Sequence, residues 1–297
     1  MTALFERPAI RRAISIGRLV FTPAAVIFLA MATWQARDLI GSVLQGARRD
    51  LLLAAVVCWC GSHVLGPVFS FIALRQCGIA LPFRTVVGIH VRRLPARYLP
   101  GGIWHTVSRM SDLRHKGAGR QLLFALVVGE NLLPLSAAIL LAGLAGWWAG
   151  FAAWALAALA CATVLIIGIF HGMRYLLRGV HAIPLRPFLG MLMATIGFWL
   201  LAGTSFALYW QSFPSVANAE ITHVYGAYWL AWSGGFLAIF APQGIGVFES
   251  IFAFLLKGAA PFSKLVVIAA GFRVVVLVAD AVSYSVLASL EGFRRHA

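Results

Sequence analysis

Charged residues lie deep inside two apolar stretches of the sequence. Glu130 is ten residues into the stretch 120–146, and Arg273 is about twelve residues into the stretch 261–290. In helices, these positions would be about 15–18 Å from the helix start and close to the middle of a bilayer. A lone charge there costs at least about 2.5–3.5 kcal/mol. Each charge therefore requires a partner or a function.

Asp280 follows Arg273 by seven residues, so both lie on nearly the same face of a helix. The sequence allows two structural ion pairs, Arg273 with Asp280 or Arg273 with Glu130. The other interpretation is functional, because ionisable groups inside a membrane usually mark substrate or ion paths. The sequence does not decide between them.

Arginines also bracket a turn of proline and glycine at 100–102. Arg97 precedes this turn and Arg109 follows it. A guanidinium group offers two parallel donors that match phosphate, so these two residues are predicted to bind a phosphate group. Arg92 and Arg93 fit phosphate binding and ordinary cytoplasmic surface charge equally well.

A second turn of the same kind has the sequence PQGIGVFE at 242–249. If a helix begins just after its glycines, the free amides at the start of that helix point toward the turn and favour an anion. The same holds for the helix expected after Gly101 and Gly102. Both turns are therefore predicted to hold phosphate, with Glu249 close to the second.

An offset of 142 residues relates the two turns. It places 100–103 on 242–245, Ser108 on Ser250, and 129–131 on 271–273. We predict one transmembrane domain, 1–297, built from inverted repeats 1–147 and 148–297, the plan of many secondary transporters. The alternative is two unrelated turns in surface loops.

Composition identifies the solvent of this chain as lipid. Of 297 residues, 61% are hydrophobic and 11% charged, with a mean hydropathy of +0.89, so polar groups are too few to cover a soluble fold. We predict an all-α polytopic membrane protein with seven or eight membrane segments and two re-entrant Pro-Gly hairpins. The clearest spans are 15–36, 50–74, 120–146, 148–170, 187–210, 222–241 and 261–290.

Basic residues predict the orientation. With a cytoplasmic N-terminus, the inside segments carry 18 Lys and Arg residues and the outside segments carry 5. This asymmetry favours cytoplasmic N- and C-termini. The membrane that we expect for the chain is the bacterial cytoplasmic (inner) membrane. Segment 75–120 must then be a cytoplasmic loop or dip into the membrane from inside, and 222–260 must enter and return from outside.

Other classes of partner find little support. The net charge of +15 falls between the apolar spans, so anionic lipid is a better partner than nucleic acid. The four cysteines lack the spacing of a metal site, and no metal or other cofactor is expected. A homo-oligomer is compatible with the pattern. The cysteines are Cys58, Cys60, Cys77 and Cys161.

The motifs RYLPGGI at 97–103, GEN at 129–131 and PQGIGVFE at 242–249, with Arg109 and Arg273, resemble one family. It is the transmembrane, flippase-like region of lysylphosphatidylglycerol synthases, here as a stand-alone member without the cytosolic synthase domain. The resemblance covers most of the chain. Asn131 stands where many members have a basic residue.

The resemblance implies a lipid translocase that moves a phosphate-headgroup lipid between leaflets through a central cavity. The lipid would be a phospholipid or a polyprenyl-phosphate-linked sugar. The predicted substrate-binding residues are Arg97, Pro100, Gly101, Gly102, His105, Arg109, Glu130, Asn131, Pro242, Gln243, Gly244, Glu249, Arg273 and Asp280.

Two alternatives remain open. The basic turn would suit a transporter of a small soluble anion equally well. A membrane-embedded lipid-modifying enzyme would use His90, His105 or His115 as base and Ser108 as nucleophile, with Asp112 as the nearby acid. Because these histidines lack a carboxylate at convincing spacing, we do not expect an enzyme.

Overall fold

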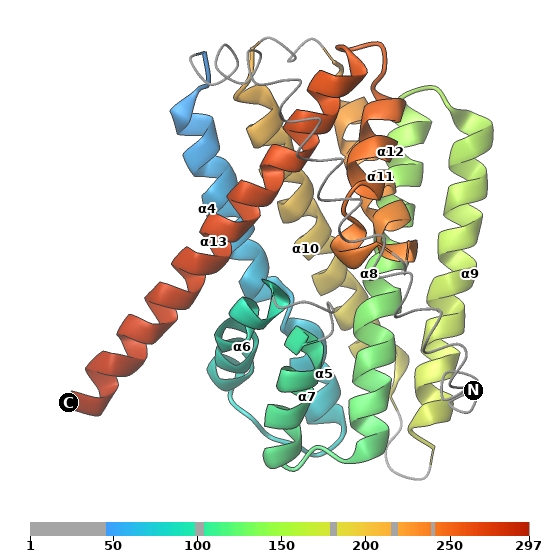
Figure 1. Ribbon diagram of the computed structural model, residues 1–297. Coiled ribbons are helices and arrows are strands. Elements are labelled where there is room, and N and C mark those ends of the chain that lie inside the picture. Colours follow the sequence, from blue (N-terminus) through green and yellow to red (C-terminus); the bar gives the residue numbers. More distant parts are fainter. Residues whose placement is uncertain (1–45, 99–103, 179–182, 215–218, 239–240, 297) are drawn as a thin grey trace, which may run out of the picture.

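The computed structural model describes residues 46–98, 104–178, 183–214, 219–238 and 241–296, and every regular element in these ranges is helical (Figure 1). The predicted span 15–36 lies outside them. The elements are α4 (Arg49–Leu65), α5 (Val68–Gln76), α6 (Phe83–Arg92), η1 (Leu94–Tyr98), α7 (Trp104–His115), α8 (Arg120–Trp148), α9 (Ala152–Leu176), α10 (Leu185–Gln211), α11 (Ile221–Leu237), η2 (Pro242–Gly244), α12 (Val247–Leu255) and α13 (Phe262–His296).

Five helical stretches in the described ranges are long and apolar enough to cross a membrane, with 25 to 29 residues each. About 20 residues suffice for a hydrocarbon core of about 30 Å. Large apolar side chains such as Val57 and Val164 face outward, as expected for contact with lipid. The all-α membrane class is confirmed. The stretches are Arg49–Gln76, Arg120–Trp148, Ala152–Leu176, Leu185–Gln211 and Phe262–Leu290.

Two of the predicted spans differ in detail. The first long span is broken between α4 and α5, because Pro67 has no N–H to continue the helical hydrogen-bond ladder. The span predicted at 222–241 is the 17-residue helix α11, which ends at Leu237. At 1.5 Å per residue, its 17 residues rise about 26 Å, which is short of a hydrocarbon core of about 30 Å.

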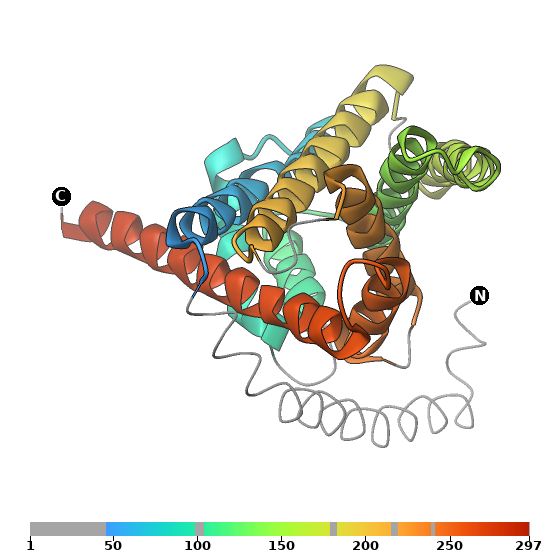
Figure 2. The ribbon, with the colours of Figure 1, turned by 90° about the horizontal axis from the view of Figure 1, so that it is seen from above.

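Two hairpins of short helices approach the middle of the bundle from opposite ends (Figure 1). The first consists of α6, η1 and α7, and the second consists of α11, η2 and α12. Seen from above, α9 lies at the edge of the bundle against α8 (Figure 2). The hairpins therefore bring residues about 145 positions apart in the sequence to the same region.

The order of elements repeats along the chain. In each half a short helix, a 3-10 turn and a second short helix are followed by a long helix. The long helices α8 and α13 begin at Arg120 and Phe262, which are separated by the offset of 142 residues found in the sequence. Helix α12 begins at Val247, one residue past the position that matches the start of α7 at this offset.

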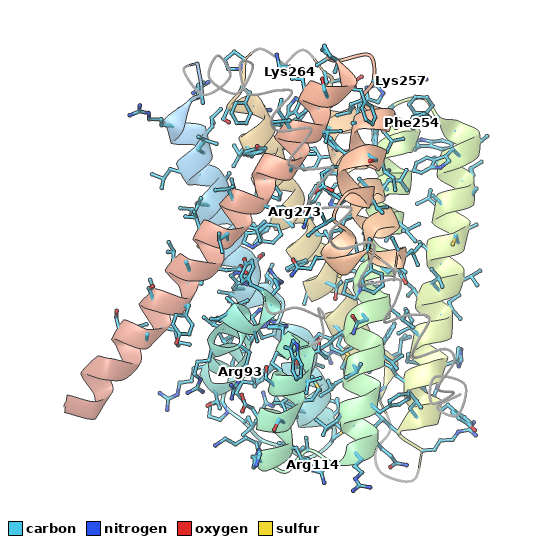
Figure 3. The ribbon with its side chains drawn as sticks, viewed as in Figure 1. Arg93, Arg114, Phe254, Lys257, Lys264 and Arg273 are labelled. Carbon is cyan, nitrogen blue, oxygen red and sulfur yellow. The ribbon has the colours of Figure 1, made fainter. Side chains whose placement is uncertain are left out.

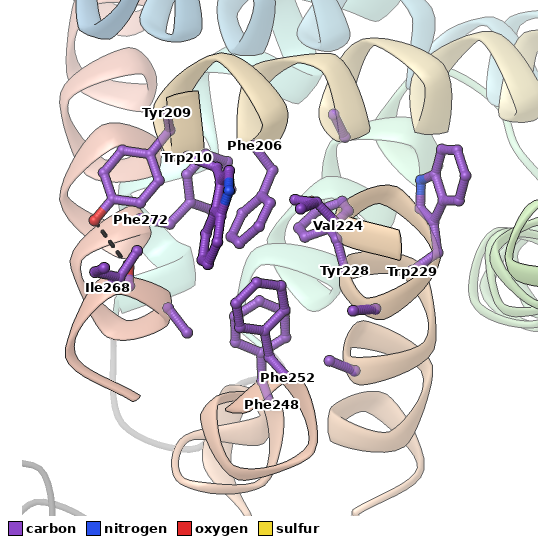
Figure 4. Close-up of a cluster of buried hydrophobic side chains, with 14 of the residues drawn as sticks. Phe206, Tyr209, Trp210, Val224, Tyr228, Trp229, Phe248, Phe252, Ile268 and Phe272 are labelled. Carbon is purple, nitrogen blue, oxygen red and sulfur yellow. Dashed lines mark hydrogen bonds between the residues drawn. The ribbon is translucent and has the colours of Figure 1, made fainter. Parts of the chain in front are cut away.

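A cluster of buried aromatic side chains fixes the second hairpin (Figure 4). Phe206 of α10 stacks on Tyr228 of α11, with ring centroids 4.7 Å apart. Its centroid also lies 4.9 Å from those of Phe252 in α12 and Phe272 in α13. Such ring pairs contribute about 0.5–1.5 kcal/mol each beyond the burial of area. Four helices are thereby held around one ring.

A separate buried cluster fixes the first hairpin. It packs Val86 and Ile89 of α6 and Leu113 of α7 against α5, α8, α9 and α10. Each hairpin therefore has its own apolar support. The charged groups between the hairpins therefore have a packed apolar cluster on either side.

Gly244 allows the turn of the second hairpin to pack directly on α11. Its φ is +66°, and an added Cβ would lie 2.8 Å from the Cα of Gly235. We expect Gly244→Ala to lower the melting temperature in detergent more than Gly246→Ala. Gly246 has a similar φ of +84° but open space around it, so its substitution should cost only the backbone penalty of about 1–2 kcal/mol. The clash at Gly244 should add about 1–3 kcal/mol. Equal melting temperatures of the two variants would contradict the close packing.

Candidate functional site

The tips of the two hairpins touch. The side-chain amide of Gln243, in η2, donates a hydrogen bond of 2.6 Å to the backbone carbonyl of Arg97, at the end of η1. Gln243 is the only residue other than glycine with a positive φ, at 53°, in the described ranges. This conformation costs about 1–2 kcal/mol, and the contact between the tips offsets it.

The first charged pair joins the returning helix of the first hairpin to the next long helix. Arg109 of α7 pairs with Glu130 of α8, and the hydroxyl of Ser70 in α5 also donates to Glu130. Arg109 donates to the Ser70 oxygen at 3.2 Å. Both charged side chains are largely enclosed, at 12% and 13% exposure.

The second charged pair occupies the equivalent place in the second hairpin. The Nε of Arg273 in α13 donates to Glu249 of α12 at 2.7 Å. The other carboxylate oxygen of Glu249 accepts the N–H of Gly246 at 2.7 Å. The anion at the start of α12 is thus the protein's own carboxylate, which corrects the prediction that this amide is free for phosphate.

The third charged group is Asp280, which is buried in α13. Its carboxylate accepts hydrogen bonds from His63 at 2.8 Å, from Tyr98 at 2.9 Å and from Arg97 at 3.1 Å. The indole of Trp59 adds a fourth donor at 3.4 Å. A buried carboxylate needs such donors to replace water.

Neither of the two ion pairs considered for Arg273 forms, because Arg273 pairs with Glu249. Arg273 and Asp280 share a helix but are separated by about 10 Å along it, and Asp280 is bound from other elements. Glu130 is taken by Arg109. The packing of the hairpins decides which charged side chains meet. The second short helix of each hairpin contributes one of them, Arg109 from α7 and Glu249 from α12.

The pairs in the two hairpins have the same placement and opposite polarity. In the first, the cation lies on the short helix and the anion on the long helix; in the second, Glu249 is on the short helix and Arg273 on the long one. Each pair fastens a returning helix to the helix that follows it. Positions 130 and 273 lie within one residue of the offset of 142.

Comparison with models of known protein families finds no match. A search of curated proteins likewise finds no relative with significant similarity. The resemblance drawn from the sequence motifs therefore stays a prediction. The function must be argued from the geometry of the site.

Among the described residues, three other predicted site residues take no part in the three charged groups. Asn131 donates to the carbonyl of Val127 in its own helix, at 2.7 Å, and is not joined to the charged groups by any interaction described here. Pro242 begins η2 and Gly244 ends it, packed on α11. The predicted residues Pro100, Gly101 and Gly102 lie outside the described residues.

Three of the groups considered for the enzyme alternative are bonded elsewhere. The hydroxyl of Ser108 donates to the carbonyl of Trp104 at 2.6 Å, within its own helix. Asp112 accepts two hydrogen bonds of 2.7 Å from Arg93, and His115 bonds to the backbone of Ser111. In this arrangement no nucleophile–base pair forms among these groups.

Several site residues were missed by sequence reasoning. His63, Ser70 and Tyr98 all contact the buried charges. His63 had a usable signal, because it is an ionisable residue inside an apolar stretch, as Glu130 is. Ser70 and Tyr98 gave none, since both residue types are common in membrane helices and at their ends.

Proposed function

We propose that this protein is a lipid translocase that moves a phosphate-headgroup lipid between the leaflets of a membrane. The observation that carries the proposal is an asymmetry of exposure. Arg97 is 32% exposed and its partner Asp280 only 2%. Arg273 is 32% exposed and its partner Glu249 is fully buried. The accessible charge at both hairpin tips is therefore positive.

A guanidinium group suits a phosphate because it can donate two parallel hydrogen bonds to its oxygens. For Arg273, these would replace the hydrogen bonds of 3.4 Å that its Nη1 and Nη2 donate to the Gln243 carbonyl. Apolar side chains near the first tip are also exposed. Tyr98, Trp104 and Val107 are between 43% and 49% exposed. Such a surface would contact acyl chains while the arginines bind the headgroup. A phospholipid or a polyprenyl-phosphate-linked sugar has both parts.

The proposed membrane arrangement has two inverted repeats with re-entrant hairpins around a central cavity. The repeated order of helices and the opposed hairpins support it. Within the membrane, a turn of irregular backbone is tolerated only where protein or a cavity surrounds it, and the tips lie against each other. The family resemblance, with its paired Pro-Gly motifs, implies the same plan.

The proposed orientation places the α5–α6, α7–α8 and α9–α10 connections in the cytoplasm. Figure 3 shows Arg93 and Arg114 toward that end of the bundle, Lys257 and Lys264 at the other end, and Arg273 between them. Cytoplasmic ends of membrane proteins carry the excess of basic residues. The basic residues in or beside these connections are Arg75, Arg84, Arg114, Lys116, Arg120, Arg174, Arg178 and Arg186.

Purified protein in liposomes tests the proposal. Fluorescent phospholipids with several headgroups should exchange leaflets faster than in protein-free vesicles, while phosphate trapped inside the vesicles is retained. Release of trapped phosphate without lipid exchange would favour the transporter of a small soluble anion. If the trapped phosphate is retained and lipid exchange does not exceed the protein-free rate, both functions are contradicted.

Arg97→Gln should slow leaflet exchange about 10- to 100-fold. A hydrogen bond from a charged group contributes about 1.5–3 kcal/mol, and about 1.4 kcal/mol corresponds to a factor of ten. The matched control is Arg84→Gln, an exposed arginine in the first turn of α6. The initial rate of exchange is measured at equal protein density. Equal slowing of both variants would indicate a general effect of charge and contradict the role of Arg97.

A further inference from the structure

Three histidines form a row that leads away from Asp280. The Nε2 of His63 lies 2.8 Å from the carboxylate, and its Nδ1 lies 3.4 Å from the Nε2 of His90. The rings of His90 and His105 follow, with centroids 5.3 Å apart and an angle of 89° between them. The four residues come from α13, α4, α6 and α7, so the row crosses from the bundle into the first hairpin.

The hydrogen bonds fix where the protons of this row reside. Because a carboxylate only accepts, the Nε2 of His63 must carry the hydrogen. A neutral His63 then has a bare Nδ1, so the facing Nε2 of His90 must be the donor. This leaves the Nδ1 of His90 without a hydrogen. The first two members of the row are therefore ordered, with the N–H groups of His63 and His90 directed toward Asp280.

Two ring nitrogens in the row have no partner. The Nδ1 of His90 and the Nε2 of His105 are both buried and make no hydrogen bond within the described part of the chain. Most buried polar atoms in proteins are paired, so each exception calls for an explanation. A bare ring nitrogen at the far end of a hydrogen-bonded chain is a place where a proton can be accepted.

We propose that this row conducts protons and that the proton is the coupling ion of the translocase, an inference that rests on the proposed function. A proton from the aqueous phase, taken up at the His105 side, forms an N–H bond at the Nδ1 of His90. The hydrogen on Nε2 of His90 passes to the Nδ1 of His63. The hydrogen on Nε2 of His63 passes to Asp280. One proton enters, and one carboxylic acid is formed.

Delivery of the proton to Asp280 would release Arg97. A neutral carboxyl group no longer attracts the guanidinium, which at 32% exposure is already turned toward accessible space. The freed arginine can then bind a phosphate group. Because the Arg97 carbonyl accepts the hydrogen bond from Gln243, the same event reaches the contact between the two hairpins.

The surrounding charges favour transfer over storage of the proton. Burial disfavours a positive charge on the ring of His90, and Arg109 of α7 and Arg97 add positive charges near it, while His105 and His63 flank it. A lasting positive charge on the row would be repelled by both arginines, whereas a proton on Asp280 neutralises a negative charge. The phenol of Tyr98 completes the groups around that carboxylate. Among Asp280 and the three histidines, the carboxylate is the group whose protonation removes a charge instead of adding one.

Infrared difference spectroscopy of the purified protein tests proton delivery without any lipid movement. Lowering the pH protonates exposed carboxylates such as Asp50 and Glu220 in every variant, so the signal of each variant is compared with that of the wild type. The band of one buried protonated carboxyl group should be present in the wild type and in Asp112→Asn and missing in Asp280→Asn. Asp112 is the matched control because it pairs with Arg93 away from the row. Absence of the band in the wild type, or its persistence in Asp280→Asn, would overturn the proposal.

A pH gradient across liposomes tests the coupling. At equilibrium, one proton per lipid should change the distribution of a fluorescent phospholipid between leaflets about tenfold for each unit of pH difference. His63→Gln can still donate to Asp280 but cannot relay a proton, so the response should disappear, whereas the exposed His171→Gln should respond like the wild type.

The response is the ratio of lipid distribution with and without the gradient, which a merely slower variant would still show. Lipid exchange that ignores the gradient in the wild type, or an unchanged response in His63→Gln, would overturn coupling while leaving translocation standing. Absence of any lipid exchange would instead overturn the proposed function and coupling together. The infrared result would then decide alone whether the row delivers a proton.

Discussion

Reversing one charge of the Arg109–Glu130 pair will sharply reduce the yield of folded protein, and exchanging both charges will restore most of it. Arg109→Glu or Glu130→Arg alone places two like charges together where both side chains are only 12–13% exposed. Loss of a buried pair typically costs about 3–5 kcal/mol. The double variant re-forms the pair in the opposite sense. Monodisperse protein from size-exclusion chromatography in detergent is the measurement.

The double variant with both charges swapped also distinguishes a structural ion pair from a pair that binds substrate. In our account Arg109 fastens the first hairpin and Arg97 faces the headgroup, so the double variant should recover lipid exchange along with folding. The Arg93–Asp112 pair, which is 41% and 27% exposed, is the matched control, and its single reversals should have small effects. A folded double variant without lipid exchange would assign Arg109 to the substrate.

Replacing both members of the Glu249–Arg273 pair by glutamine should leave a folded protein that exchanges lipid 10- to 100-fold more slowly. The double change removes the charge of Arg273 without leaving Glu249 as a buried, unpaired anion. It also removes one of the two accessible cations at the hairpin tips. Loss of one charged hydrogen bond to phosphate accounts for about this factor.

The control is the same double change at the enclosed pair, Arg109→Gln with Glu130→Gln. This pair exposes little of its guanidinium, so its neutral version should keep most of the exchange rate. Circular dichroism and melting temperature report folding of both double variants. If the two variants slow exchange equally, the difference in exposure between the pairs has no functional meaning.

The membrane class and most long helices followed from apolar length. The spans predicted at 120–146 and 187–210 are α8, Arg120–Trp148, and α10, Leu185–Gln211. Such runs are predictable because every backbone group in lipid must be satisfied within its own helix. The break at Pro67 shows the limit of length alone. The predicted span 50–74 ignored this break, whereas Pro134 lies inside α8 without ending it, so a proline in an apolar run does not by itself decide where a helix breaks.

The partners of the charges could not be read from the sequence. A helical period places Arg273 and Asp280 on one face, but it says nothing about which hairpin approaches that face. Arg273 meets Glu249 because η2 returns the chain against α13, and Asp280 meets Arg97 because η1 ends beside it. Contacts of this kind depend on the tertiary packing of both hairpins.

The histidine row was hidden for a similar reason. His63, His90 and His105 are spread over three helices and share no sequence spacing. Their common feature is that each is polar within or beside an apolar stretch. His105 was among the predicted binding residues, and His90 and His105 were among the candidate bases of an enzyme, but His63 was missed. Only the fold places them in line with Asp280.

The central claim is that accessible arginines at the hairpin tips select and move lipids with a phosphate headgroup. The most direct test compares a fluorescent phospholipid with a neutral sugar-headgroup lipid that has the same acyl chains, in the same proteoliposomes. We predict that the protein accelerates leaflet exchange of the phospholipid at least about tenfold more than that of the neutral lipid. Equal acceleration of both lipids, or of neither, would contradict the account.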